Sequence, residues 1–394
     1  MQREVVITSG ARTAIGDFGG GLKDLPPTEL GARVVREALT RAAVHGDEVD
    51  HVVFGNVHQA GPKDLYLARV VAVHGGVGPH VPALTVNRLC GSGLEAIISA
   101  SQQISVGAAD IAIAGGAENM SMTPYLSPSA RFGQRMGDAR MIDMLLGGLT
   151  DPFLSMPMGG IAEQLARQRG ITRRAQDELA LESHRRAAGA AARGYFAEQV
   201  LPLEMSSRKG KFFFDRDEHV RGDASIAEFA SMKPAFSKED GTVTPGNACA
   251  ISDAAAAVAL MELGVAQKRG GRVLGRLVAY AHVGVEPMQM GLGPVPATRK
   301  ALQRAGLKIT DLDVVESNEA FAAQAIAVMQ ELDLDPAKVN PNGSGISLGH
   351  PVGATGAIMV IKALYELHRT GGRYALVTTC IGGGQGIAAI LERA

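Results

Sequence analysis

Short apolar runs alternate with helical patterns along most of the chain, and this alternation is the feature that most constrains the fold. Runs such as VVIT and HVVFG have strand length and few polar interruptions, which is typical of strands that are buried on both faces. Residues 28–44 and 93–107 instead carry apolar side chains at helical spacing. This pattern predicts an α/β protein with a largely buried sheet and excludes all-α and all-β folds.

Length and charge limit the kind of partner. The 394 residues are 46% hydrophobic and 20% charged, enough apolar material for one large domain or two to three ordinary ones. The formal net charge is −1, and no long run of like charge occurs, so neither a nucleic acid nor a membrane partner is expected. The N-terminal segment lacks the apolar core of a secretory signal, and no stretch is long enough to span a bilayer. We therefore expect a cytoplasmic protein that acts on a small molecule.

The chain also contains an apparent internal repeat. Residues Glu37–Val53 resemble Lys300–Glu316 at a constant offset of 263, so that Asp50, for example, matches Asp313. Any two amphipathic units that run from helix to strand look alike, and this pair alone supports duplication and coincidence about equally.

Two cysteine motifs favour duplication. Cys90 in VNRLCGSGLEAI and Cys380 in VTTCIGGGQGIAAI each follow an apolar run and precede a glycine-rich turn. We interpret both as a strand, a cysteine, a tight turn and a helix. Residues 121–250, rich in Met, Arg, Pro and Phe, interrupt the repeat. The predicted organisation is a first half of residues 1–120 plus 251–271, an inserted loop domain of residues 121–250, and a second half of residues 272–394.

The surroundings of Cys90 suggest a nucleophile. Its position at the end of a β-like run, before Gly91, Ser92, Gly93 and a helical pattern, is the sequence form of a nucleophile elbow. The helix dipole and its free N–H groups would favour the thiolate near neutral pH. A buried core cysteine is the commoner fate of a free thiol, but a cysteine that only packs does not need flanking glycines. The three cysteines of the chain are too few and too far apart for a disulfide framework or a zinc site.

Three further features could support this chemistry. The glycines after Cys380 could bring backbone N–H groups onto an oxyanion, although such turns also bind phosphates. His350 lies between Gly349 and Pro351, in a loop that would hold an imidazole rigidly for proton transfer. Asn318 follows a predicted strand, where its amide could serve the site or simply cap a helix.

The motifs NRLCGSG, GGAENMS, NEAFA, NGSGISLGHPVGATG and CIGGGQG, in this order, resemble the thiolase family from end to end. The resemblance is greatest to bacterial acetyl-CoA acetyltransferases and β-ketothiolases. It implies a duplicated five-layered αβαβα fold with an inserted loop domain, assembled as a homodimer or homotetramer. It also implies a role in fatty-acid metabolism or polyhydroxyalkanoate biosynthesis.

The resemblance assigns roles to five residues. Cys90 would accept the acyl group, His350 would activate it, and Cys380 would be the acid/base at the substrate α-carbon. Asn318, through a bound water, would join His350 in holding the thioester oxygen. The backbone N–H groups of Cys90 and Gly382 would hold the oxyanion of the enzyme thioester.

By the same resemblance, the inserted segment supplies most of the coenzyme A site. The expected contacts are Leu149, Met158, Arg221, Phe236, Cys249 and Phe321. The sequence departs from the family at Pro157, where relatives commonly carry His, and at Cys249 and Ala250, where they typically carry Ser and Gly. These departures bear on acyl-chain preference and coenzyme A affinity and leave the nucleophilic residues intact.

The predicted activity is that of an acetyl-CoA C-acyltransferase. It condenses acetyl-CoA with an acyl-CoA, or cleaves a 3-ketoacyl-CoA with coenzyme A, through an acyl-cysteine. No metal or prosthetic group is implied, since coenzyme A is carried by substrate and product. One alternative is a decarboxylating ketoacyl synthase, which uses His where Cys380 stands. The other is a catalytically silent thiolase-fold subunit.

Overall fold

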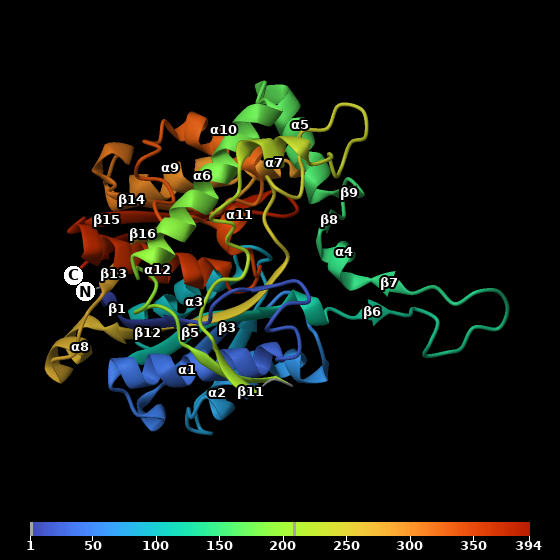
Figure 1. Ribbon diagram of the computed structural model, residues 1–394. Coiled ribbons are helices and arrows are strands. Elements are labelled where there is room, and N and C mark those ends of the chain that lie inside the picture. Colours follow the sequence, from blue (N-terminus) through green and yellow to red (C-terminus); the bar gives the residue numbers. More distant parts are fainter. Residues whose placement is uncertain (1–2, 208–209) are drawn as a thin grey trace.

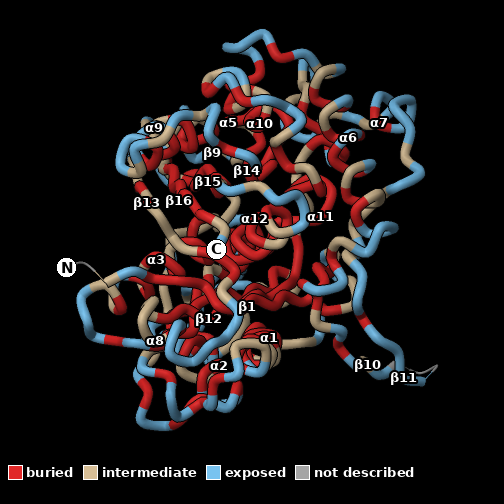
Figure 2. Tube along the Cα trace, turned by 90° about the vertical axis from the view of Figure 1, so that its left-hand side faces the viewer, coloured by how far each residue is buried: buried red, intermediate tan, exposed pale blue. Residues whose placement is uncertain are grey.

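Two buried helices lie at the centre of the molecule. The computed structural model describes residues 3–207 and 210–394. In it, α3 (Ser92–Ser105) and α12 (Thr355–Thr370) pack against each other. Twelve of the sixteen residues of α12 are buried, as expected for a helix that is apolar on most of its circumference. Figure 2 shows buried residues concentrated around α12 and β12, between the outer helices.

The two central helices are enclosed by the two halves of one long sheet, and further helices cover its outer faces (Figure 1). The first half pairs β1, β12, β5, β3 and β4, and the second pairs β14, β15, β16 and β13. The layers therefore follow the predicted αβαβα order. The strands are β1 (Val5–Arg12), β3 (His51–Gly55), β4 (Ala83–Val86), β5 (Ile111–Asn119), β12 (Ser252–Glu262), β13 (Gly275–Gly284), β14 (Val314–Ser317), β15 (Tyr374–Ile381) and β16 (Gln385–Arg393).

The halves meet along a short seam between β1 and β13. Only Val6 with Arg276 and Ile7 with Gly275 are paired there. The outer layers are formed by α1 and α2 on one side and by α9 and α10 on the other (Figure 1). Their bounds are α1 (Pro27–Ala42), α2 (Leu67–His74), α9 (Pro294–Ala305) and α10 (Ala322–Leu332).

The duplication predicted from sequence is present in the fold. Ser92 and Thr355 begin α3 and α12, and Ile111 and Tyr374 begin β5 and β15, so both pairs of elements are 263 residues apart. The same offset relates β3 to β14. By this offset, the loop that carries Cys90 corresponds to the loop between His350 and α12.

One part of the sequence argument for duplication is wrong. Cys380 lies on β15 and is followed by a turn and by β16, with Cys380 paired to Gly386 in the hairpin. No helix follows it. Because β16 is buried on both faces, its sequence lacks the alternation that separates a strand from a buried helix. Cys90 and Cys380 therefore occupy different elements of the repeat.

The inserted segment contains more helix than the sequence suggested. Its helices are α4 (Met144–Gly148), α5 (Met158–Arg169), α6 (Arg173–Ala192) and α7 (Ile226–Ser231). Its strands form three separate two-stranded sheets: β6 (Tyr125–Leu126) and β7 (Ile142–Asp143), β8 (Thr150–Asp151) and β9 (Met156–Pro157), and β10 (Leu203–Ser207) and β11 (Gly210–Phe214). A buried bidentate ion pair between Arg12 and Asp217, at 2.7 and 3.0 Å, ties this segment to β1. The ribbon between β6 and β7 projects away from the body (Figure 1). None of the helices in the described part of the chain is long and apolar enough to cross a bilayer.

Candidate active site

All three cysteines line one narrow cavity near the N-terminal ends of the two central helices. Its volume is about 70 Å³. The sequence placed Cys90, Cys380 and His350 in one site, and the fold brings them together here with Cys249. The full lining is Val57, His58, Leu89, Cys90, Gly148, Leu149, Met158, Cys249, Met290, Ala320, Phe321, His350, Val352, Cys380 and Gly382.

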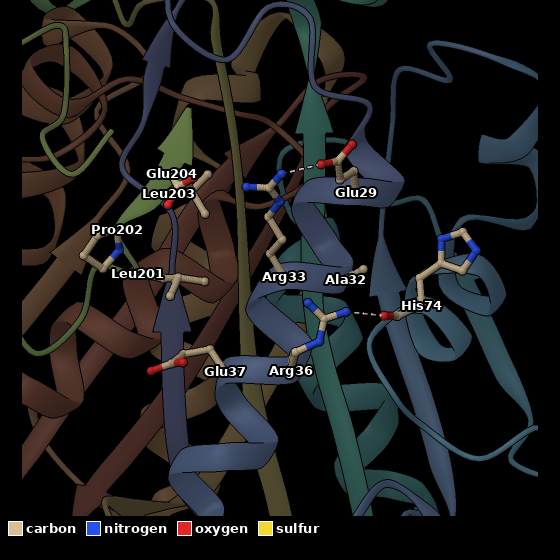
Figure 3. Close-up of a pocket in the computed structure, with 10 residues that line it drawn as sticks. All are labelled: Glu29, Ala32, Arg33, Arg36, Glu37, His74, Leu201, Pro202, Leu203 and Glu204. Carbon is tan, nitrogen blue, oxygen red and sulfur yellow. Dashed lines mark hydrogen bonds and ion pairs between the residues drawn. The ribbon is translucent and has the colours of Figure 1, made fainter. Parts of the chain in front are cut away.

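A larger hollow of about 660 Å³ lies elsewhere, between α1 and the segment that enters β10 (Figure 3). Its charged groups are paired within the protein. Arg33 bonds Glu29 on the same helix, and Arg36 donates to the carbonyl of His74 at 2.7 Å. No cysteine lines it, and its paired charges offer no evident nucleophile.

Cys90 stands on a sharply bent turn at the start of α3. The preceding residue, Leu89, has a φ of +46°, a left-handed conformation that bulky side chains rarely adopt. The turn is held locally: Asn87 Oδ1 accepts from the Leu89 N–H at 2.9 Å, and Ser92 Oγ accepts from the Arg88 N–H at 2.8 Å and donates to the Leu89 carbonyl. These bonds stabilise a strained backbone that directs the thiol into the cavity.

Burial opposes the thiolate that the helix dipole was expected to favour at Cys90. Burial raises the pKa of Cys90 to about 11, and this outweighs the opposing effect of the N–H groups of Gly382 and of Cys90 itself. The apolar wall formed by Val57, Leu149 and Val352 around the sulfur accounts for the desolvation. A neutral thiol needs a base to become nucleophilic, so the position of His350 is decisive.

His350 is held as a neutral base. Its side chain is 4% exposed, and burial lowers its pKa to about 4. Nδ1 lies 2.7 Å from Thr355 Oγ1, which is itself 2.9 Å from the carbonyl of Pro351. Because a carbonyl can only accept, the Thr355 hydroxyl donates to Pro351 and must accept from Nδ1–H. This leaves Nε2 unprotonated, so it is the basic atom of the ring.

Asn318 faces that basic nitrogen. Its Nδ2 lies 3.3 Å from His350 Nε2, while its Oδ1 is buried without a hydrogen-bond partner in the described part of the chain. A buried carbonyl oxygen without a donor is costly unless a water or ligand completes it. Asn318 does not cap a helix, since α10 begins later, with Phe321 at its N-cap. The amide is therefore available to the site.

Cys380 is a buried thiol at the end of β15. It is 1% exposed, and burial together with the neighbouring Cys90 and Cys249 raises its pKa well above the ordinary value. The turn that follows needs glycine at Gly383 and Gly384, which have φ of +80° and +83°. This turn directs the N–H of Gly382 towards Cys90, so the backbone after one cysteine serves the other.

The expected coenzyme A contacts fall into two groups. Leu149, Met158, Cys249 and Phe321 line the cavity, and Phe236 meets Phe321 edge-on with ring centroids 6.4 Å apart. Arg221 is not part of the cavity lining; its backbone N–H donates to His184.

The residues at which the sequence departs from the family lie close to these contacts. Pro157 is the exposed N-cap of α5. The carbonyl of Ala250 accepts from the His350 N–H at 3.2 Å. Burial and the neighbouring Cys90 raise the pKa of Cys249 to about 12, so Cys249 is a neutral thiol.

Sequence reasoning missed Glu118, which organises two loops of the site. Its carboxylate accepts from the N–H groups of Val57 and His58, at 3.1 and 3.0 Å, and from that of Gly353 at 2.8 Å. It thereby links one wall of the cavity to the loop of His350. The motif GGAENMS contains this residue, but a carboxylate in a buried strand has no local pattern that reveals its role.

Comparisons with known proteins agree with this geometry. Residues 5–263 match the family model for the thiolase N-terminal domain, and residues 271–393 match that for the thiolase C-terminal domain. The chain is 64% identical to the β-ketothiolase BktB of Cupriavidus necator, over 100% of both chains. It is 45% identical to the acetyl-CoA acetyltransferase of Pseudomonas aeruginosa, over 99% of this chain and 100% of that protein.

Solved structures give the same result. Human mitochondrial 3-ketoacyl-CoA thiolase matches with a TM-score of 0.97 and 42% identity, covering 100% of this chain and 99% of that one. An acetyl-CoA acetyltransferase of Bacillus anthracis has the same score and identity. Both family models together span nearly the whole sequence, and the relatives align from end to end. The chain belongs to the thiolase family.

Proposed function

We propose that this thiolase catalyses the reversible condensation of acetyl-CoA with an acyl-CoA, and the thiolysis of 3-ketoacyl-CoA, through an acyl group on Cys90. The observation that carries the proposal is the meeting of two thiols and one neutral imidazole, Cys90, Cys380 and His350, in a single cavity. Carbon–carbon bond formation between thioesters needs both a nucleophile and a separate acid/base at carbon.

In the first half-reaction, Nε2 of His350 accepts the thiol proton of Cys90. The sulfur attacks the thioester carbonyl, the bond from that carbon to the coenzyme A sulfur breaks, and the imidazolium gives its proton to the departing thiolate. The products are acyl-Cys90 and free coenzyme A. The N–H groups of Cys90 and Gly382 already point at this sulfur and would stabilise the oxyanion formed there.

The second half-reaction uses Cys380. In condensation, His350 accepts the Cys380 thiol proton, and the thiolate removes a proton from the methyl carbon of acetyl-CoA. That carbon attacks the acyl group, the bond to Cys90 breaks, and the imidazolium returns its proton to the Cys90 sulfur. In thiolysis the same steps run in reverse. The unpartnered Oδ1 of Asn318 would fix a water that, with His350, holds the enolate oxygen.

We further propose that the segment 121–250 binds coenzyme A and assists assembly, as a domain separate from the two halves 1–120 plus 251–271 and 272–394. Phe236 of this segment, which meets the cavity residue Phe321 edge-on, supports the first role. The projecting ribbon supports the second, because Phe132 is 92% and Met136 is 87% exposed, as at surfaces that contact a partner. A homodimer or homotetramer and a cytoplasmic location remain predictions. Because thiol and imidazole chemistry suffices for each step, we propose coenzyme A as substrate and no further cofactor.

Incubation with acetyl-CoA followed by intact-mass measurement tests the function. We expect an acetyl adduct on Cys90 and, with further acetyl-CoA, formation of acetoacetyl-CoA. Product formation only with malonyl-CoA would instead indicate a decarboxylating synthase. The absence of any adduct would indicate a silent subunit, a hypothesis that no feature of the cavity favours.

A further inference from the structure

His58 is a buried polar side chain for which the steps above give no role. It lines the cavity and is 6% exposed. Its backbone is fixed, since its N–H donates to Glu118 and its carbonyl accepts from Asn56. Its ring nitrogens make no hydrogen bond to any other residue of the described chain. Neither ring nitrogen is among the solvent-inaccessible polar atoms that lack a partner, so the ring is open to whatever occupies the cavity.

The position of His58 indicates which part of a substrate would meet it. The apolar residues of the cavity fall into two clusters: Val57, Leu149 and Val352 surround Cys90, whereas Phe321 packs with Cys380. His58 follows Val57 directly in the chain, and both residues line the cavity together with Cys90. An acyl group bound to the Cys90 sulfur would occupy this cavity and could reach His58.

Space for the ring is provided by Gly148, the last residue of α4. A Cβ at this position would lie 2.4 Å from Cε1 of His58 and 3.0 Å from Nε2. The ring therefore packs over bare backbone, and α4 closes this part of the cavity. A substrate group that reached this part of the cavity would find His58 beside the apolar side chains of Val57 and Leu149.

The electrostatics favour an uncharged partner. Burial lowers the pKa of His58, and the nearby carboxylate of Asp143 opposes that shift only in part. The ring is neutral at pH 7 and can both donate and accept. A carboxylate on the acyl chain would lose its hydration, gain no cation and be repelled by Asp143. A hydroxyl can accept from one ring nitrogen or donate to the other at no such cost.

We propose that His58 is a specificity-determining residue that hydrogen-bonds a hydroxyl group on the acyl chain held by Cys90. The enzyme then accepts hydroxyacyl groups as well as plain alkyl ones. This inference rests on the proposed function, because it requires an acyl group on Cys90.

The test compares three acyl-CoA thioesters in the first half-reaction alone. Butyryl-CoA and 3-hydroxypropionyl-CoA carry acyl chains of equal size, one ending in methyl and one in hydroxyl, and succinyl-CoA ends in a carboxylate. The rate of coenzyme A release in a single turnover is measured for each. We expect the wild-type protein to prefer the hydroxyl over the methyl ending by about three- to tenfold, the scale of one neutral hydrogen bond, and to react slowest with succinyl-CoA.

Variants then assign the preference to the imidazole. His58→Leu should reduce the ratio of hydroxyl to methyl rates to near one, and His58→Gln, which keeps a neutral donor and acceptor, should restore much of it. Met290→Leu, at a cavity residue that clusters with Cys380 and Phe321, is the matched control and should keep the wild-type ratio. A wild-type ratio near one, an unchanged ratio in His58→Leu, or a preference for succinyl-CoA would overturn the proposal. In each of these cases acetyl-CoA still acetylates Cys90; a protein that fails to be acetylated would overturn the proposed function as well.

Discussion

Thr355 fixes the tautomer of His350: its hydroxyl lies 2.7 Å from Nδ1 and 2.9 Å from the carbonyl of Pro351, so Nδ1 must carry the proton. His350 lies in the loop that precedes α12, and Thr355 is the first residue of that helix. Through the internal repeat, these two positions correspond to the loop of Cys90 and the start of α3. The duplicated fold thus places nucleophile and base on equivalent loops, each preceding one of the two central helices.

Removal of that hydroxyl should therefore impair the base without removing it. Thr355→Val keeps the shape of the side chain but leaves Nδ1–H unpartnered, which favours other ring tautomers and orientations. We expect acylation of Cys90 by acetyl-CoA to slow about 10- to 100-fold, part of the ~10²–10⁴ that a general base contributes. Single-turnover release of coenzyme A measures this rate. Thr355→Ser retains the hydroxyl and should remain close to wild type; equal rates in all three proteins would contradict the assignment.

The pH dependence of acylation should reflect burial of the base. With its pKa lowered to about 4, His350 stays neutral and able to accept a proton at pH values where an exposed histidine would be protonated. We expect the acid limb of the rate profile to lie well below pH 6.5. A limb near pH 6.5 in rapid-mixing experiments would contradict a buried neutral imidazole.

The same lowered pKa affects stability. Between pH 6.5 and about 4 the unfolded chain binds a proton at this histidine and the folded chain does not, so the free energy of unfolding should fall as pH decreases through this window. His184, whose pKa burial lowers to about 3, acts in the same direction. Urea unfolding midpoints at several pH values measure the effect.

The two catalytic thiols should fail in different ways when replaced. Cys90→Ala removes the only group proposed to accept the acyl chain, and both the acyl-enzyme and turnover should disappear. Cys380→Ser should still gain an acetyl group, because the first half-reaction does not use this residue, while condensation should fall by about 10²–10⁴. Intact mass and acetoacetyl-CoA formation separate the two effects. An acetyl adduct on Cys90→Ala, or near wild-type condensation by Cys380→Ser, would show that the roles are wrongly assigned.

A buried ion pair beneath the catalytic loop should contribute to stability. Lys362 Nζ lies 2.7 Å from Glu316 Oε2 and also donates to the carbonyl of Gly343, and the two charged side chains are 2% and 0% exposed. Lys362→Met leaves the carboxylate without its cation, at a cost of about 3–5 kcal/mol. We expect a lower urea midpoint for this variant. Glu316→Gln combined with Lys362→Met should recover part of the loss, and an unaltered single variant would contradict the prediction.

Most of the fold could be predicted because its elements have strong local patterns. Residues 28–44 and 93–107, which have helical spacing, correspond to α1 and α3 in the structure, and HVVFG forms β3. The element after Cys380 was wrongly predicted, since a short apolar segment buried on both faces fits strand and helix equally well. The seam between β1 and β13 depends on two residue pairs and has no sequence signature.

The candidate site was predictable in its cysteines, His350 and Asn318, because glycine-rich motifs surround most of them. Glu118 and Thr355 act through contacts that only the folded chain creates, and His58 stands in a segment without a motif. The effect of burial on the pKa of Cys90 was also not predicted. The sequence shows the helix that follows this residue but not the apolar wall of Val57, Leu149 and Val352 that outweighs the helix dipole.

The last prediction concerns Cys249, a thiol at a position where the sequence resemblance implies a hydroxyl in relatives. Cys249 lines the cavity, and its backbone N–H donates to the carbonyl of Ala320. A thiol is a weaker hydrogen-bond partner than a hydroxyl, so a pantetheine amide at this position would lose part of a contact worth ~0.5–1.5 kcal/mol. Cys249→Ser should therefore lower KM for acyl-CoA several-fold and leave kcat nearly unchanged, the pattern of a uniform binding contribution.

The competing explanation is that Cys249 and Ala250 reshape the cavity for a longer acyl chain. In that case Cys249→Ser would alter the ratio of activities on long and short 3-ketoacyl-CoA, and inhibition by free coenzyme A would not change. Parallel kinetics on acetoacetyl-CoA and a longer homologue distinguish the two, with inhibition by coenzyme A as the control. An equal improvement in KM on both substrates supports the hydrogen-bond explanation, because the pantetheine arm is common to them. A changed ratio with unaltered inhibition would rule it out, because a contact to that arm cannot discriminate between acyl chains.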